Sequence, residues 1–255
     1  MVYIFDGSYP GYLTGLFECF ERGEWDATPR SAAMSQESLF EGHRVITTDP
    51  AKAQRVQAGL VKQLGEQDSE AFFHGYLSED PYAWTAGYKL IQRIFKGTPD
   101  ILKNYGDYDV LYFAKTLKKI NRERHRMKAF VRFSKCANGL FVAMVEPDFN
   151  VLPLIATFFR NRYVDQPWLI YDIKRSYGIL YDQTAVREVH LTMAAEAQPT
   201  PTPSFSLDER DDLFKRLWKL YFKSTNITAR RNLKLHVQHV PKRYWKYLVE
   251  KNGEA

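Results

Sequence analysis

The sequence predicts an α+β fold, and three observations carry this prediction. Residues 1–66 follow the order strand, helix, strand and helix, and residues 67–126 keep the apolar spacing of helices. Strand-like alternation then dominates residues 127–193. There, the order strand–strand–helix–strand–strand is typical of an antiparallel sheet with a helix on one face. Helical spacing returns in a basic C-terminal segment, 207–255.

The chain begins with a short apolar strand, Val2–Phe5, followed by apolar residues at helical spacing over 13–20. A second strand is predicted over Arg44–Thr48. Asp49 and Pro50 mark the next helix start, because Asp is a preferred N-cap and Pro fits the first helical position. A strand–helix–strand order favours parallel pairing through a right-handed crossover.

The turn after the first strand contains Asp6, Gly7 and Ser8, with Gly11 just behind. Glycines let a backbone approach a ligand closely, and a helix start attracts anions, so these four residues are candidates for phosphate contact. They lack the spacing of a Walker loop or a dinucleotide fingerprint. A capped turn is the alternative interpretation.

The helical middle contains two clear segments, Tyr82–Lys96 and Asp107–Arg126. The second has an apolar face and, opposite it, basic residues at steps of four, three and four. That spacing places them in one row: Lys115, Lys119, Arg122 and Arg126.

After residue 127, two hairpins are predicted. Ala129–Ser134 pairs with Leu140–Val145 around Asn138-Gly139, a strong hairpin signal. The remaining elements are a helix, a second hairpin and one further strand, at Pro153–Tyr163, Trp168–Ile173 with Tyr177–Tyr181, and Val186–Thr192.

A Pro/Thr-rich stretch, 194–206, is predicted to connect an α+β core, 1–193, to the basic helical segment 207–255, which we expect to pack on that core. Ser206 and Glu209 form a candidate capping box at its start.

Composition narrows the class of protein. No apolar run approaches the roughly 20 residues that span a bilayer, and the N-terminus lacks a signal-peptide pattern, so we expect a cytoplasmic protein with no membrane partner. The two cysteines, Cys19 and Cys136, are too few for a cysteine-ligated iron–sulfur cluster and form no zinc motif. We therefore expect no metal and no cofactor.

The charge is unevenly distributed. The first 80 residues carry six Lys/Arg and thirteen Asp/Glu, whereas the rest carry 30 and 17. This asymmetry favours one polyanion-facing side. An aromatic content of 15% suits unstacked nucleic acid, whose bases stack on rings, although aromatic side chains also fill cores.

The densest basic run lies between Lys115 and Lys135, with nine Lys/Arg and one acid, Glu123. Phosphates can neutralise such a run with release of counterions. In the predicted strand, alternation places Arg132 on the face of Phe130, where an Arg can hold phosphate while the ring stacks on a base. A solvated helix end with a salt-bridged Arg132 is the alternative.

Several side chains are candidates for chemistry. Glu146 and Asp148, one residue apart, are able to serve as a general acid and base, although acids are also common at strand ends. Asp172 and His125 are further catalytic candidates, although the spacing of Asp172 and Arg175 favours an internal salt bridge that orders the loop. Other candidate nucleic-acid contacts are Arg162, Arg175, Arg230, Asn232 and Arg243. Nearby, Tyr244 and Trp245 are either docking anchors or stacking platforms.

Motifs along nearly the whole chain occur in a distinctive order: Asp6-Gly7-Ser8 with Gly11, Arg124–Phe133, Glu146-Pro147-Asp148, Phe159 with Arg162-Tyr163, Asp172 with Arg175, Leu217-Trp218 with Tyr221-Phe222, and Arg230 and Asn232 before Pro241, Tyr244 and Trp245. In these motifs the chain resembles a bacterial family of probable DNA metabolism or DNA repair proteins, built on a domain of unknown function. The resemblance implies partners, because family members are fused to a uracil-DNA-glycosylase-like domain or associated with a radical S-adenosylmethionine protein. It supplies no catalytic residues, and we expect this chain to be the stand-alone form.

Two hypotheses follow. The first is a DNA-binding accessory protein in DNA repair or modification, working with such a partner. The second is a DNA-acting enzyme, a glycosylase, lyase or nuclease, that uses carboxylates near Glu146. The enzyme hypothesis predicts that Glu146 or Asp172 lies within hydrogen-bonding distance of His125 or a metal in a basic cleft. The binding hypothesis predicts that these carboxylates are paired with arginines.

Overall fold

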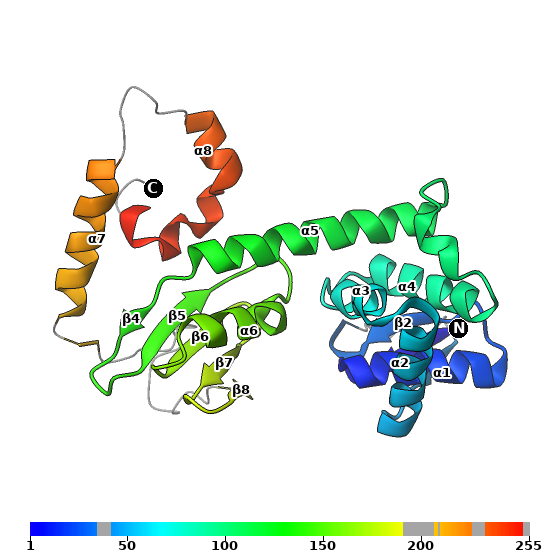
Figure 1. Ribbon diagram of the computed structural model, residues 1–255. Helices are drawn as coiled ribbons and strands as arrows, with labels where there is room; N and C mark the ends of the chain where they lie inside the picture. The colour runs from blue at the N-terminus through cyan, green and yellow to red at the C-terminus, as the bar shows by residue number, and fades with distance from the viewer. Residues whose placement is uncertain (35–41, 191–206, 209, 226–232, 252–255) are drawn as a thin grey trace. The chain divides into compact units, whose positions relative to one another are not determined.

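The computed structural model describes residues 1–34, 42–190, 207–208, 210–225 and 233–251 (Figure 1). Its mixture of helices with two sheets confirms the α+β class. The chain has two compact units, Met1–Arg122 and Glu123–Ala255. None of the described helices is long and apolar enough to cross a membrane.

The first unit contains a parallel sheet of three strands. β1 (Val2–Phe5) lies in the centre, with β2 (Thr28–Ser31) on one side and β3 (His43–Val45) on the other. The predicted parallel pairing of the first strand with the strand near Arg44 is confirmed, but β3 ends at Val45 rather than Thr48. Sequence reasoning missed β2, because the segment Thr-Pro-Arg-Ser lacks the apolar alternation that indicates a strand.

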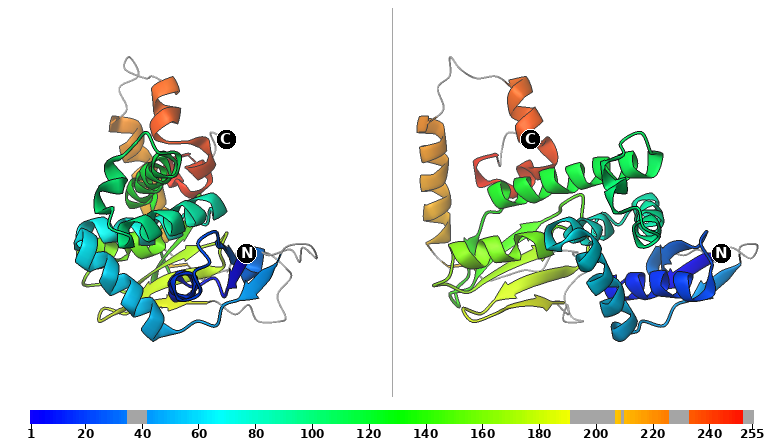
Figure 2. Two further views of the ribbon diagram at one scale, coloured as in Figure 1. Left: turned by 90° about the vertical axis from the view of Figure 1, so that its right-hand side faces the viewer. Right: turned by 45° about the vertical axis from the view of Figure 1, so that its right-hand side comes forward.

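Four helices precede α5 (Tyr108–Phe130) in this unit, which also contains the first part of α5, and side-chain caps fix where three of the four begin. Ser8, Asp49 and Asp80 accept backbone hydrogen bonds at the starts of the first, second and fourth helices. The first two helices pack side by side (Figure 2). The bounds are α1 (Tyr9–Arg22), α2 (Pro50–Leu64), α3 (Glu66–Tyr76) and α4 (Pro81–Phe95), with short 3₁₀ turns η1 (Ala32–Met34) and η2 (Pro99–Lys103).

The second unit contains a five-stranded sheet in the order β4-β5-β6-β7-β8. Its strands are β4 (Ser134–Lys135), β5 (Phe141–Val145), β6 (Trp168–Asp172), β7 (Tyr177–Tyr181) and β8 (Val186–Val189). The second predicted hairpin is present, and the first is present only through the two residues of β4. The prediction of an antiparallel sheet is wrong at β5 and β6, which pair in parallel. The reason is α6 (Leu152–Arg162), which connects these two strands as a crossover, so the chain re-enters the sheet in the same direction (Figures 1 and 2).

The predicted strand Ala129–Ser134 is also wrong. The helix α5 (Tyr108–Phe130) continues to Phe130, and only the two residues of β4 are extended. Ile120, Glu123 and Met127 are all buried, so the inward face of α5 keeps its helical spacing into this region. Burial along that face outweighs the strand preference of the aromatic and branched residues beyond it.

The C-terminal segment is helical and contains buried aromatic side chains. Tyr244 and Trp245 are 1% and 9% exposed, which identifies them as packing anchors. The connector 194–206 and the pair Ser206 and Glu209 lie outside the described residues. The elements are α7 (Asp211–Thr225), α8 (Leu233–His239), η4 (Lys242–Tyr247) and η5 (Val249–Lys251).

Candidate nucleic-acid interface

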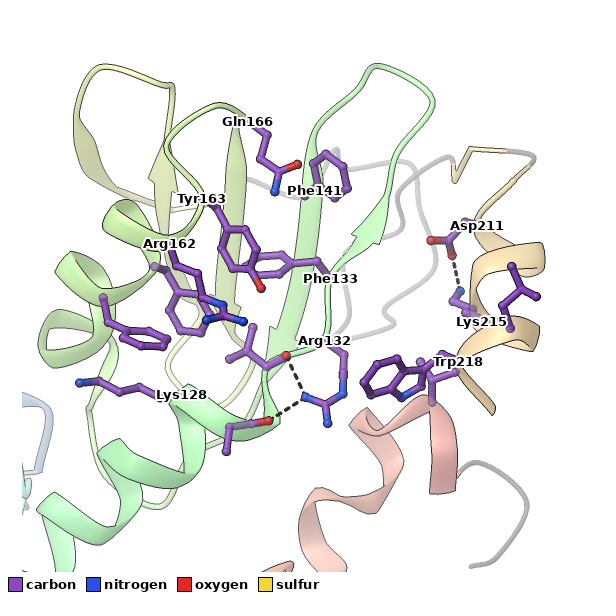
Figure 3. A pocket seen from close by; sticks show the side chains of 16 residues that line it. Lys128, Arg132, Phe133, Phe141, Arg162, Tyr163, Gln166, Asp211, Lys215 and Trp218 are labelled. Carbon is purple, nitrogen blue, oxygen red and sulfur yellow. Dashed lines mark hydrogen bonds and ion pairs between the residues drawn. The ribbon is translucent and has the colours of Figure 1, made fainter. Parts of the chain in front are cut away.

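A cavity of about 1050 Å³ lies in the second unit (Figure 3). Its walls come from the end of α5, the residues directly after α5, and the helices α6 and α7. Its lining combines two kinds of side chain. The cationic ones are Lys128, Arg132, Arg162 and Lys215. The aromatic ones are Phe133, Phe141, Phe158, Phe159, Tyr163 and Trp218. We call this cavity the aromatic groove.

One wall of the aromatic groove is a fixed cluster of rings centred on Phe133. Its ring centroid lies 5.8 Å from that of Phe159 and 5.5 Å from that of Tyr163, both in edge-to-face geometry. Trp168, 1% exposed, supports the cluster from the sheet, 6.4 Å from Phe133. Edge-to-face packing holds each ring in place, so this wall offers a preformed apolar surface.

Opposite this wall, Trp218 stands on α7 and is 40% exposed. Its indole Nε1 donates a hydrogen bond of 2.9 Å to Glu250, whose other oxygen accepts one of 2.9 Å from Arg132. The Arg132 guanidinium also lies 5.5 Å from the centre of the Trp218 ring. Burial raises the pKa of Glu250, but the hydrogen bonds, first among them that from Arg132, hold it below its usual value.

These contacts revise the geometry expected for Arg132. It does not share a strand face with Phe130, because Phe130 ends α5 and packs on Tyr244 with ring centroids 5.4 Å apart. Arg132 donates to the carbonyls of Ala129 and Val131 as well as to Glu250. The salt-bridged alternative therefore describes Arg132.

The other cations of the groove differ in their pairing. Lys215 lies 2.6 Å from Asp211 in an ion pair. Lys128 and Arg162 have no carboxylate partner among the residues that the structure describes. The Lys128 ammonium lies 5.0 Å from the centre of the Phe158 ring, and the Arg162 guanidinium 5.7 Å from that of Tyr163. Both charges are thus adjacent to aromatic faces and available to an anion.

The predicted basic row lies on α5. Lys115, Lys119 and Arg122 are exposed, whereas Arg126 is half-buried and lies 3.7 Å from Glu123. Three members of the row therefore present their charge to solvent.

Asp172, a catalytic candidate, is fully buried and holds the turn between β6 and β7. Its carboxylate accepts backbone hydrogen bonds from Lys174 (2.9 Å) and Arg175 (3.2 Å), and a side-chain one of 2.8 Å from Arg175. The Arg175 guanidinium also donates to the carbonyls of Pro147 and Asp148. Burial raises the pKa of Asp172, and the Arg175 contacts oppose that rise. Asp172 and Arg175 thus join two loops.

The other catalytic candidates are also engaged. Glu146 lies 2.5 Å from the Lys246 ammonium and accepts a 2.8 Å hydrogen bond from Tyr247. Asp148 lies 2.6 Å from Arg243. His125 is exposed on α5, and within the described ranges no hydrogen bond or ion pair joins it to Glu146 or Asp172.

A family model described as a domain of unknown function, DUF4130, matches residues 81–250. The chain belongs to this family. No curated protein matches the chain.

The DUF4130 match includes the aromatic groove, the α5 row and the paired carboxylates. It also includes Arg230 and Asn232, which lie outside the described residues.

The turn after β1 precedes the match. There, Asp6 accepts hydrogen bonds from Ser8 and Thr48, and Ser8 caps α1 by accepting one from the Gly11 backbone. Gly7 has a φ of +90°, a value that favours glycine, so all four residues have roles in a capped turn.

Glu123 is a DUF4130 residue whose role sequence reasoning missed. Its side chain is 2% exposed and accepts hydrogen bonds from the Tyr244 hydroxyl (2.5 Å), the Asp148 backbone (3.0 Å) and Arg243 (3.3 Å). Arg243, a candidate DNA contact, thus bridges two carboxylates. The available signal was position, since Glu123 follows Ile120 by three residues on the apolar face of α5.

Glu146→Gln should lower the free energy of unfolding at neutral pH but not in acid. The hydrogen bonds from Lys246 and then Tyr247 hold the pKa of Glu146 below its usual 4.5. The stability it contributes is therefore present above pH 4.5 and lost as the pH falls through the folded-state pKa. Because Lys246 is exposed, solvent screening keeps the difference below about 1 kcal/mol. Urea unfolding of variant and parent across this pH range measures it.

Glu70→Gln, which changes an exposed carboxylate on α3 with no ion pair among the described residues, is the control and should show a smaller difference. A Glu146→Gln effect of equal size in acid and at neutral pH would contradict the assignment of a charged pair.

Proposed function

We propose that this DUF4130 chain is a DNA-binding accessory protein in DNA repair or modification, which holds single-stranded or unstacked DNA in the aromatic groove. The observation that supports this most is the combination of a fixed wall of rings with two cations, Lys128 and Arg162, that have no carboxylate partner among the described residues. Base stacking on aromatic side chains beside a basic path for the backbone is the general mode of single-strand binding.

In this proposal the two kinds of side chain have separate tasks. Bases stack against Tyr163 or Trp218, which contributes roughly 1–3 kcal/mol per base. Lys128 and Arg162 neutralise phosphates and release counterions, which makes binding depend on salt. Lys119 and Arg122, exposed on the part of α5 that belongs to the first unit, are proposed as phosphate contacts in their own right.

The pairing of the carboxylates favours an accessory protein over the alternative, an enzyme that uses groups near Glu146. Asp172 is buried beneath Arg175, and Glu146 is paired with Lys246. The hydrogen bond that Lys246 donates to Glu146 raises the pKa of Lys246. A raised pKa keeps the amine protonated, so Lys246 is a weaker nucleophile for a lyase reaction. We therefore assign the chemistry to a separate partner. The family resemblance suggests a radical S-adenosylmethionine protein or a uracil-DNA-glycosylase-like protein, acting in the cytoplasm.

The test is DNA affinity as a function of salt concentration. Each of Lys128→Ala, Arg162→Ala, Lys119→Ala and Arg122→Ala should weaken binding and flatten the plot of log affinity against log salt by about 1. Fluorescence anisotropy with labelled single-stranded and duplex DNA of one sequence measures both quantities. The groove variants should affect the single strand more than the duplex.

Lys62→Ala, which removes an exposed cation from α2 in the first unit, is the matched control and should leave the slope unchanged. If all four variants kept the parent's slope, or if the protein bound no DNA at low salt, the proposed function would be rejected.

A further inference from the structure

A second cavity, of about 660 Å³, lies in the same unit and is lined by segments that are distant in sequence. They are the residues after β5, the turn between β6 and β7, and η4. Its charged lining consists of Glu146, Asp148, Lys174, Lys242, Arg243 and Lys246. We call it the basic cavity.

Buried charged groups fix the walls of the basic cavity. Arg175, whose side chain is 8% exposed, donates to the carbonyls of Pro147 (3.1 Å) and Asp148 (3.2 Å) while paired with the buried Asp172. From the other side, Glu123 accepts from the backbone N–H of Asp148 and from Arg243. The acidic segment, the Lys174 turn and the start of η4 are therefore held in fixed positions before any ligand arrives.

The pairing within the cavity leaves a positive excess. Glu146 neutralises Lys246 at 2.5 Å, and Asp148 neutralises Arg243 at 2.6 Å. Lys174 and Lys242 have no carboxylate within 4.0 Å among the described residues. The Lys174 ammonium donates to the Asp148 carbonyl, at 3.4 Å, and the Lys242 ammonium lies 5.8 Å from the centre of the Trp245 ring. Among the side chains that line the cavity, four cations against two carboxylates leave two positive charges. Glu123, which lies outside the lining, is shared between Arg243 and Arg126 and does not change this excess.

We propose that the basic cavity binds a phosphate monoester, with Lys174 and Lys242 as its principal contacts. A phosphate monoester carries close to two negative charges at neutral pH, because its second pKa is about 6. An internal DNA phosphate is a diester and carries one, so the excess charge matches a terminal phosphate. The cavity also has room beyond the phosphate for an attached nucleoside. Such a phosphate occurs on the end of a DNA strand and on a free nucleotide.

This site is separate from the aromatic groove, since the two cavities share no lining residue. The proposal therefore goes beyond the proposed function. Groove variants should leave a preference for terminal phosphate intact, and variants of the basic cavity should leave the salt dependence of groove binding intact, so either proposal can fail alone.

The test compares short DNA oligonucleotides of one sequence that carry a 5′-phosphate, a 3′-phosphate or hydroxyls at both ends. By isothermal titration calorimetry, the parent protein should bind one phosphorylated form at least about tenfold more tightly than the hydroxyl form. Lys174→Ala/Lys242→Ala should abolish that preference. The matched control, Lys62→Ala/Lys234→Ala, removes two exposed lysines that do not line the cavity and should retain it.

Deoxyadenosine 5′-monophosphate and deoxyadenosine distinguish the two sources of the phosphate. The quantity compared is the gain in affinity from the phosphate: mononucleotide over deoxyadenosine, and phosphorylated over hydroxyl oligonucleotide. Equal gains would identify a free nucleotide as a sufficient ligand, and a larger gain on the oligonucleotide would identify a strand end. Both outcomes support a phosphate monoester. Equal affinity of the parent for phosphorylated and unphosphorylated probes would overturn the proposal, and so would a preference that survives in Lys174→Ala/Lys242→Ala.

Discussion

Asp172→Ala is expected to lower the free energy of unfolding by about 3–5 kcal/mol, because it leaves the guanidinium of Arg175 buried without its carboxylate. It also removes the acceptor for the backbone N–H groups of Lys174 and Arg175. Chemical denaturation of the purified variant measures the loss. Asp172→Asn keeps an oxygen for those two backbone groups and should lose less.

The double variant Asp172→Ala/Arg175→Met separates a lost pair from an unpaired charge. Because each single change leaves the other member of the Asp172–Arg175 pair buried without it, the double variant should be less destabilised than the sum of the two single variants. Asp165→Ala, at an exposed acid before β6, is the control and should change stability by no more than about 0.5 kcal/mol. Strictly additive losses, or a near-neutral Asp172→Ala, would show that Asp172 is not the structural link between the two loops.

The elements that sequence reasoning placed correctly are those whose signals are local. The N-cap Asp49 with Pro50, and the Asn138-Gly139 hairpin, fix an element boundary within a few residues. The strand predicted over Ala129–Ser134 failed because its aromatic and branched residues adjoin a helix whose buried face continues to Met127. The parallel pairing of β5 with β6 was predictable in principle, since the crossover rule applied to the first unit applies equally to α6.

The candidate site was less predictable, because its pairings join residues far apart in the chain. Arg162 was expected to be a DNA contact and does line the aromatic groove. Arg132 and Arg243 carry the same charge, yet they are paired with Glu250 and Glu123, more than 100 residues away. A cation's availability depends on which carboxylate the fold brings to it, and composition does not contain that information.

Trp218→Ala is expected to weaken single-stranded DNA binding about 10- to 100-fold, the effect of losing one stacking platform worth roughly 1–3 kcal/mol. The slope of log affinity against log salt should stay unchanged, because no charge is removed. Since Trp218 is 40% exposed on α7, the variant should fold, and thermal unfolding verifies this. Affinity for duplex DNA should fall less, because paired bases present no free face to the indole.

Trp25→Ala is the matched control, because Trp25 is 39% exposed, belongs to the first unit and does not line the aromatic groove. Trp218→Phe should keep part of the affinity, since a smaller ring still stacks. If the Trp218→Ala protein folds and binds single-stranded DNA as tightly as the parent, the proposal that bases stack on Trp218 is wrong. If Trp218→Ala lost the same affinity for single-stranded and duplex DNA, α7 would contact the DNA backbone rather than stack on bases.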